Sequence, residues 1–357
     1  MKTIFLGIVS LFLCCDIFGQ SNNTYDVALA KISQMIERPE GNSFKKVVFL
    51  VENSYLNGEL DFNDFDANLN TLKQLAISSM LSYKIDYSSA DSNVIGVYAG
   101  IFKMFTDTVG LKKSDKFYLH DPFQYDFDDI FGSSDWSRMF VTKLMRTNSG
   151  NCHSLPYLYK ILCNEFKVPC HLALAPNHIY IKHRAKKGGW YNTELTSASF
   201  PMDAWLMASG YISLEAVQKG IYLNTLSEKE SIALCVLDLA QGYDHKYPDN
   251  DGKFIIECCD LALKHFPDYV NAILLKAETR LKQLQAMQKE MKYAYLKEVT
   301  AMPEGKAKWD EMNSLYMQLY KFGYRQMPEQ MYVEWLTSLK TEKEKYANKQ
   351  APGAIKD

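Results

Sequence analysis

Between residues 148 and 200 the spacing of apolar residues changes from helical to strand-like, within a chain whose pattern is otherwise helical. This segment limits the possible folds more than any other part of the sequence. The run Ser-Gly-Asn at 149–151 is turn-like, and residues 152–166 place apolar side chains at the three- and four-residue spacing of a helix. Three short apolar or alternating segments follow and predict strands, at residues 168–173, 177–184 and 190–196. A helix followed by a small antiparallel sheet is expected to form the core of an α+β fold.

Helical patterns lie on both sides of this segment. Residues 25–144 repeat apolar positions at helical spacing, and after Pro201 no further strand is expected. The run LALKHFPDYVNAILLKAETRL, which starts at Leu261, carries small residues at its packing positions and resembles the junction between two tetratricopeptide repeats. A last amphipathic helix is predicted at residues 327–345.

The chain of 357 residues is longer than one hydrophobic core usually organises, so more than one folding unit is expected. The patterns divide it into a signal peptide at 1–19, an N-terminal helical region at 20–144, the core at 145–205, a tetratricopeptide-like helical region at 206–345 and a polar tail at 346–357.

The N-terminus predicts export. A positive charge precedes a nearly unbroken apolar run at 4–15, which is too short to span a bilayer but suits the centre of a secretory signal. The small residue Gly19 predicts cleavage after it, so the mature protein is expected in the periplasm or outside the cell. A lipid anchor at Cys14 or Cys15 is the less favoured alternative, because Leu13 stands where a small residue is expected.

The charge pattern argues against two classes of partner. The 40 basic and 42 acidic side chains are well mixed and give a formal net charge of −2. Without a basic stripe or a polybasic cluster, neither nucleic acid nor an anionic membrane surface is an expected partner. No later segment predicts a membrane span.

Metal and cofactor binding are also not expected. Cys152, His153, His171 and His178 include no short ligand pair such as C-x-x-C or H-E-x-x-H. The six cysteines that follow the signal segment show no spacing that fixes a disulfide pattern, so their pairing stays open.

Three residues form the candidate catalytic set: Cys152, His178 and Glu194. Cys152 lies at the predicted start of a helix, where free backbone N–H groups and the helix dipole favour a thiolate. His178 opens the first strand of a predicted hairpin and Glu194 lies in the second. Taken singly, the three would be a buried thiol, a strand histidine and a surface charge; their order and placement favour a catalytic set.

The predicted register would bring the histidine and the glutamate together. A turn centred on residue 186, inside the Gly- and Lys-rich loop 185–189, would place His178 opposite or nearly opposite Glu194 on one face of the sheet. A carboxylate there can orient the imidazole while the other ring nitrogen faces a thiol. A one-residue slip would separate them onto opposite faces. His153, His171 and His183 have no predicted partner and are expected to be structural or exposed.

At these residues the chain resembles the transglutaminase-like branch of the papain-like cysteine enzymes. The matching runs are SGNCHSLPYLYKIL, APNHIYIKH and WYNTELT, which together lie within residues 145–200. That family starts a helix with its cysteine and places its histidine and an acidic residue on following strands. The resemblance therefore implies a papain-like core with a Cys152–His178–Glu194 triad. The flanking helices also resemble those of bacterial members with a helical preface and trailing tetratricopeptide-like helices.

The chain departs from the family pattern at two places. Glu194 stands where aspartate is usual, which lengthens the reach by one methylene group. The donor that would bind the oxyanion is not fixed by a Gln or Trp upstream of Cys152; Asn148, Asn151 and Trp136 are the candidates.

The resemblance implies a cysteine acyl-transfer enzyme that hydrolyses or transamidates a peptide or related amide. The alternative is an inactive transglutaminase-like scaffold that binds a protein partner through its tetratricopeptide-like helices. A third hypothesis makes the helical regions a regulatory cover, in which residues 25–144 fold against the hairpin and restrict access to the cleft.

Overall fold

The computed structural model describes residues 17–83, 85–113 and 116–341 as an α+β protein. Its helices are α1 (Ile17–Glu37), α2 (Ser43–Tyr55), α3 (Phe62–Ser82), α4 (Ser92–Thr106), the 3-10 helix η1 (Trp136–Met139), α5 (Val141–Thr147), α6 (Ser154–Glu165), α7 (Asp203–Ser209), α8 (Leu214–Gln218), α9 (Glu228–Lys246), α10 (Lys253–His265), α11 (Val270–Glu290), α12 (Leu296–Val299), α13 (Pro303–Lys321) and α14 (Glu329–Thr341). Its strands are β1 (Val109–Lys113), β2 (Lys116–His120), β3 (Gln124–Tyr125), β4 (Ser149–Gly150), β5 (His171–Ala175), β6 (His178–Ala185) and β7 (Gly189–Thr193).

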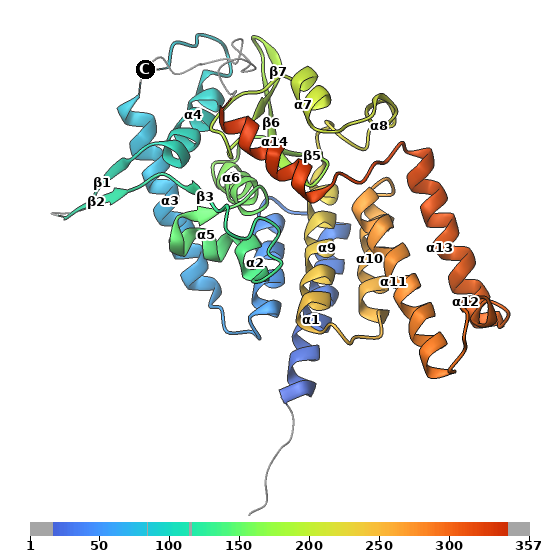
Figure 1. Ribbon diagram of the computed structural model, residues 1–357. Coiled ribbons are helices and arrows are strands. Elements are labelled where there is room, and N and C mark those ends of the chain that lie inside the picture. Colours follow the sequence, from blue (N-terminus) through green and yellow to red (C-terminus); the bar gives the residue numbers. More distant parts are fainter. Residues whose placement is uncertain (1–16, 84, 114–115, 342–357) are drawn as a thin grey trace, which may run out of the picture.

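The centre of the molecule is helix α6 packed against the antiparallel sheet β5–β6–β7. Every residue of α6 from Ser154 to Cys163 is buried, as expected for a helix that is apolar around most of its circumference. The sheet covers one side of α6, and α3, α4 and α5 pack around the others. The predicted helix and all three predicted strands are therefore present, with ends that differ by a few residues (Figure 1).

The hairpin register differs from the predicted one by two residues. Ile181 pairs with Thr193 and Arg184 with Trp190, so the turn is centred on residue 187. Because side chains alternate with a period of two along a strand, this shift leaves His178 and Glu194 on the same face of the sheet. Continued to these residues, the register makes them diagonal neighbours rather than direct partners.

The N-terminal and C-terminal helices share one packed layer. Helix α9 lies beside α1 and α2, α10 packs on α9, α11 on α10 and α13 on α11. Figure 1 shows these helices side by side, with α13 at the far edge. The buried apolar residues form one continuous cluster that includes α1 and α2, the α6–sheet core and the C-terminal helices.

The expectation that residues 25–144 are mainly helical is wrong for its last third. Strands β1 and β2 form an antiparallel hairpin, and β3 pairs in parallel with β4, so that Tyr125 lies beside Gly150. The first four residues of β2 are all exposed, so no buried alternation marks this strand in the sequence. The short β3–β4 pairing holds the loop that contains residue 125 against the turn that precedes Cys152.

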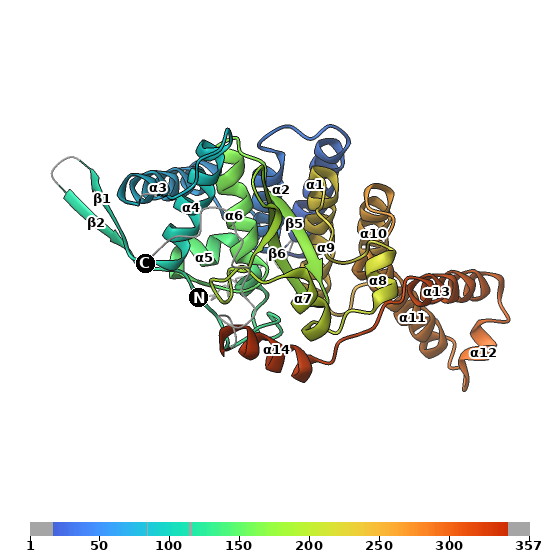
Figure 2. The ribbon, with the colours of Figure 1, turned by 90° about the horizontal axis from the view of Figure 1, so that it is seen from above.

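The predicted C-terminal amphipathic helix is α14, and its position is unexpected. After α13 the chain turns back and lays α14 across the sheet side of the molecule, beside α7 and away from α13 (Figure 2). Tyr332, Trp335 and Leu336 are the buried residues on its inner face.

Two predicted segments lie largely or wholly outside the described residues: most of the signal peptide at 1–19 and the whole tail at 346–357. In the part of the chain that the structure does describe, no helix has the length and apolar character needed to cross a membrane.

The buried side chain of Glu52 links α2 to the start of α5, and this link can be tested by substitution. Its carboxylate is buried and accepts hydrogen bonds from the backbone N–H of Val141 (2.7 Å) and Thr142 (2.9 Å), which joins α2 to the start of α5. Replacing Glu52 by Gln turns an NH₂ group toward one of these donors. We expect the free energy of unfolding, measured by urea denaturation, to fall by about 1–3 kcal/mol. The exposed Glu59→Gln should change it by less than about 0.5 kcal/mol; equal effects would contradict this role.

Candidate active site

Cys152 lies in the turn directly before α6, which begins at Ser154, two residues later than predicted. The side-chain Oδ1 of Asn151 accepts hydrogen bonds from the backbone N–H of His153 and of Ser154, both at 3.1 Å. Asn151 therefore caps the helix, and Cys152 sits at its N-terminal end. The thiol points toward the start of β6, where Sγ lies 3.7 Å from the carbonyl oxygen of Asn177.

His178 and Glu194 meet as the sequence predicts. His178 Nε2 lies 2.6 Å from Glu194 Oε2, and both side chains are almost fully buried. The other carboxylate oxygen of Glu194 accepts a hydrogen bond from the backbone N–H of Thr196 at 2.8 Å. With Nε2 engaged by the carboxylate, Nδ1 of His178 is turned toward the side of Cys152. The structure thus brings all three predicted site residues together.

A fourth residue, Tyr332 of α14, joins the set and was not predicted. Its hydroxyl donates to Cys152 Sγ at 2.9 Å and lies 3.0 Å from His178 Nδ1. A tyrosine hydroxyl has one proton; when it donates to sulfur, its oxygen accepts from Nδ1. His178 then carries a proton on each nitrogen, since Nε2 faces a carboxylate. The hydrogen-bond pattern fits an imidazolium beside a thiolate.

The pKa shifts agree with that pattern. Burial alone would lower the pKa of His178, but the Glu194 carboxylate and the Cys152 sulfur raise it to about 10. Burial would raise the pKa of the Cys152 thiol, yet the hydrogen bonds and positive charge of His178 hold it below the ordinary value. By contrast, burial raises the pKa of Cys163, Cys235 and Cys258. Cys152 is the activated thiol by this criterion.

Helix α14 covers the site. The ring of Trp335 packs edge-on against the His178 ring, with centroids 4.9 Å apart, and stacks with Trp205 of α7. Tyr332 also packs against Phe131. Cys152 is 8% exposed, and a substrate carbonyl cannot reach Sγ at the place that the Tyr332 hydroxyl occupies. The cover over Cys152 therefore comes from the C-terminal helix α14. The expectation that the N-terminal helices provide it is wrong for this contact.

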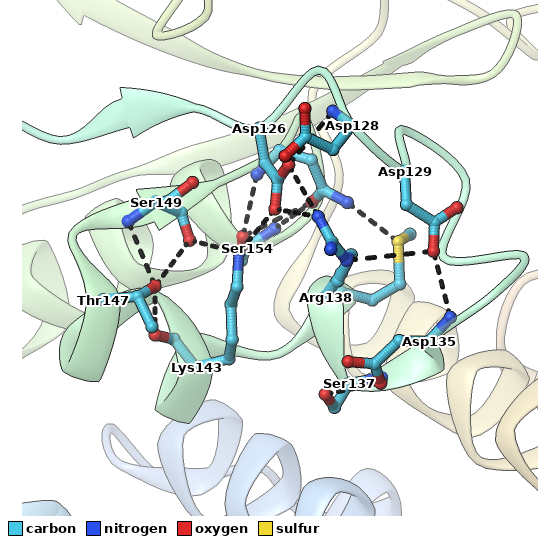
Figure 3. A network of polar contacts seen from close by, with 12 residues as sticks. Asp126, Asp128, Asp129, Asp135, Ser137, Arg138, Lys143, Thr147, Ser149 and Ser154 are labelled. Atoms are coloured by element: carbon cyan, nitrogen blue, oxygen red, sulfur yellow. Dashed lines mark hydrogen bonds and ion pairs between the residues drawn. The ribbon is translucent and has the colours of Figure 1, made fainter.

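The floor of the site is a charged network in the loop before α5. The Asp126 carboxylate receives two hydrogen bonds from Arg138 and one from Lys143, and Arg138 also approaches Asp129 (Figure 3). Burial would raise the pKa of Asp126, but Lys143 and Arg138 hold it below its ordinary value. The backbone N–H of Asp126 donates to the carbonyl oxygen of Gly150 at 2.7 Å, so the network fixes the turn that presents Cys152.

His153 has a partner, contrary to the expectation from the sequence. Its Nδ1 lies 2.9 Å from the carbonyl oxygen of Met139 and its Nε2 lies 3.0 Å from Asp238 Oδ1, on α9. Since both neighbours are acceptors, both ring nitrogens carry protons. Burial would lower the pKa of His153, but Asp238 raises it to about 9. This buried cation is next to Cys152 in the chain and also favours its thiolate form. Asp238 lies 85 positions after His153 in the chain, so no local sequence pattern could predict this ion pair.

None of the three predicted oxyanion donors faces the thiol. Asn151 Nδ2 donates to the carbonyl oxygen of Ile130, Asn148 lines a groove of about 1,020 Å³ between α3 and the β1–β2 hairpin, and Trp136 stacks on His245. The residue that does lie beside Cys152 is Tyr125, whose hydroxyl is buried. Its sequence neighbourhood carries no motif that would have singled it out.

The described residues form neither a metal-binding cluster nor a disulfide. No group of three or more His, Cys, Asp or Glu side chains within 17–83, 85–113 and 116–341 is arranged to hold a metal ion. Cys152, Cys163, Cys170, Cys235, Cys258 and Cys259 are all buried free thiols. In comparisons with protein-family models, curated proteins and solved structures, nothing matches this chain.

Two substitutions of Tyr332 should separate its hydrogen bond from its cover. Tyr332→Phe keeps the ring but removes the donor to Sγ, so the pKa of Cys152 should rise and alkylation at neutral pH should slow roughly tenfold. Tyr332→Ala also uncovers the thiol, so the limiting rate on the alkaline plateau should increase. The measurement is iodoacetamide labelling of the Cys152 peptide by mass spectrometry. Profiles of both variants that match the wild type would show that Tyr332 does neither.

Asp238→Asn should raise the pKa of Cys152. The change removes the carboxylate that keeps His153 charged, so the midpoint of thiolate formation should move to higher pH. Thiolate is measured as ultraviolet absorbance, by difference from Cys152→Ala, which needs no reagent access. The control is Glu228→Gln, which breaks the Lys160–Glu228 ion pair (2.8 Å), another link between α6 and α9, without altering His153. If the midpoint of thiolate formation shifts equally in both variants, the cause is lost packing between α6 and α9 and not the charge of His153.

Proposed function

We propose that this chain is an exported, transglutaminase-like cysteine acyl-transfer enzyme with a papain-like core, which acts on a peptide or related amide. The observation that carries the proposal is the buried chain of contacts from Cys152 through Tyr332 and His178 to Glu194. His178 uses Nε2 for the carboxylate and leaves Nδ1 for the thiol side. That division of roles is what a thiolate–imidazolium pair requires.

The reaction follows from these positions. The Cys152 thiolate attacks the carbonyl carbon, and His178 Nδ1 gives its proton to the leaving amine as the C–N bond breaks. The product is a thioester on Cys152. Water, or an amine in a transamidation, then attacks the thioester; His178 takes one proton from the attacking group, and the sulfur leaves as thiolate. Glu194 stays ionised and stabilises the imidazolium. Water is the default acceptor, so hydrolysis is the favoured outcome.

Access of a substrate requires α14 to move. The Tyr332 hydroxyl occupies the position beside Sγ that a carbonyl group must enter, and Trp335 closes the side of His178. The segment before α14 is held by few polar contacts, among them Asn177 Nδ2 to the carbonyl oxygen of Met327 (3.3 Å). Displacement of this helix would open the site without disturbing the α6–sheet core.

The second candidate function is a protein-binding module whose Cys152 site is catalytically inactive. The cover over Cys152 favours it, as does an exposed aromatic face on α13, where Trp309, Tyr316 and Tyr320 are 36%, 36% and 77% exposed. These three lie seven and four residues apart, which is the spacing of one helical face. On this alternative the helical array would hold a protein partner.

The test is the pH dependence of Cys152 alkylation in the mature protein and in His178→Ala. An activated pair should label below pH 7, because the thiolate persists as long as His178 is protonated, up to its pKa of about 10. In His178→Ala the pH dependence of labelling should be that of an ordinary thiol, with a midpoint at about pH 8.5 or above. Cys152→Ala identifies any signal from the other cysteines. A wild-type profile that matches His178→Ala would favour the binding module.

A further inference from the structure

Acyl transfer at Cys152 needs a hydrogen-bond donor for the carbonyl oxygen, which becomes negatively charged when the thiolate attacks. Asn148, Asn151 and Trp136 are all directed elsewhere. Tyr332 directs its proton to the sulfur and must leave with α14 when a substrate enters. A side-chain donor would therefore have to border Sγ and stay in place when α14 moves.

Tyr125 meets both conditions. It pairs with Gly150 in the parallel β3–β4 contact, two residues before Cys152, and the next residue, Asp126, is bonded to Gly150 through its backbone. The Asp126 carboxylate is in turn held by Arg138 and Lys143. The backbone of Tyr125 is thus tied to the same turn that presents the thiol. Its position does not depend on α14.

The hydroxyl of Tyr125 is buried beside the Cys152 sulfur, the Cys152 backbone and the Tyr332 hydroxyl, and it makes no hydrogen bond of good geometry with any described residue. A buried hydroxyl without a partner costs free energy, and such groups call for an explanation in a folded protein. Burial and the nearby sulfur raise the pKa of Tyr125, so the group remains a protonated donor. Its ring packs against Phe127, with centroids 4.7 Å apart, which keeps the hydroxyl directed into the site.

We propose that the Tyr125 hydroxyl is the side-chain donor of the oxyanion hole and binds the carbonyl oxygen of the amide or ester attacked by Cys152. The inference rests on the proposed acyl-transfer function and adds a catalytic residue to it. The hydroxyl donates a hydrogen bond throughout and transfers no proton. Once Tyr332 has withdrawn, the substrate carbonyl takes its place beside Sγ and gives the Tyr125 hydroxyl a well-placed acceptor.

Two reagents distinguish this role from activation of the thiol. Para-nitrophenyl acetate acylates Cys152 through an oxyanion, whereas iodoacetamide alkylates it by direct displacement at carbon without one. Both must pass the same cover, so the ratio of their rates cancels differences in access. In the full chain, Tyr125→Phe should leave alkylation within about twofold and slow acylation roughly 100-fold. Tyr332→Phe, the matched control, alters the sulfur and should change both rates in the same proportion.

Equal acylation by Tyr125→Phe and the wild type would overturn the inference and leave the proposed function intact. A parallel loss of both reactions would also overturn it, because Tyr125 would then act on the thiolate. A wild-type chain that alkylates but never acylates would overturn the proposed function and the inference together. If Tyr125→Phe does not fold, the wild type itself gives the answer: an oxyanion donor predicts a strong preference for the oxygen ester over its thionoester, and equal rates would refute it.

Discussion

The contact on which the site depends is the buried pair of His178 and Glu194, with 2.6 Å between Nε2 and Oε2. Two charges removed from water are stable only where each finds further partners, because desolvation costs more than their attraction returns. Glu194 has the backbone N–H of Thr196, and His178 has the Tyr332 hydroxyl. The ring of Trp335 completes the exclusion of water. Helix α14 is therefore part of what makes the pair stable in the closed form.

This dependence joins the middle of the chain to its last described helix, α14. Tyr332 lies 180 residues after Cys152, and the helical array α9–α13 stands between them in sequence. The connection to α14 is held to the start of α8 by Ser213 Oγ, which donates to the carbonyl oxygen of Gly323 (2.8 Å), and to the sheet by Asn177. The array also contributes Asp238, whose ion pair with His153 sets a second cation near the thiol. The protonation of Cys152 thus reflects contacts from α14 and from α9 as well as from the core.

Sequence patterns predicted what depends on local periodicity: the buried helix, the three strands after it, and the meeting of Cys152, His178 and Glu194. They did not predict Tyr332 or Asp238, because such contacts depend on how helices pack, and a tyrosine on an apolar helix face looks like any core residue. The β1–β2 hairpin was missed because its second strand is exposed and lacks buried alternation. Tyr125 is placed by a two-residue parallel pairing, which is too short to leave a pattern.

The two-residue difference in register explains the least usual feature of the site, which is the glutamate in the third position. Residues directly opposite in an antiparallel pair have Cβ atoms about 4.5–5.5 Å apart, whereas diagonal neighbours are roughly 7–8 Å apart. Continued beyond its last pair, Ile181 with Thr193, the register makes His178 and Glu194 diagonal; Glu194 itself follows β7 and forms an isolated bridge with Ser199. An aspartate there would fall short of Nε2, and the added methylene group of glutamate covers the difference. Glu194 is therefore the residue that this register requires, and its longer side chain accounts for the 2.6 Å contact with His178.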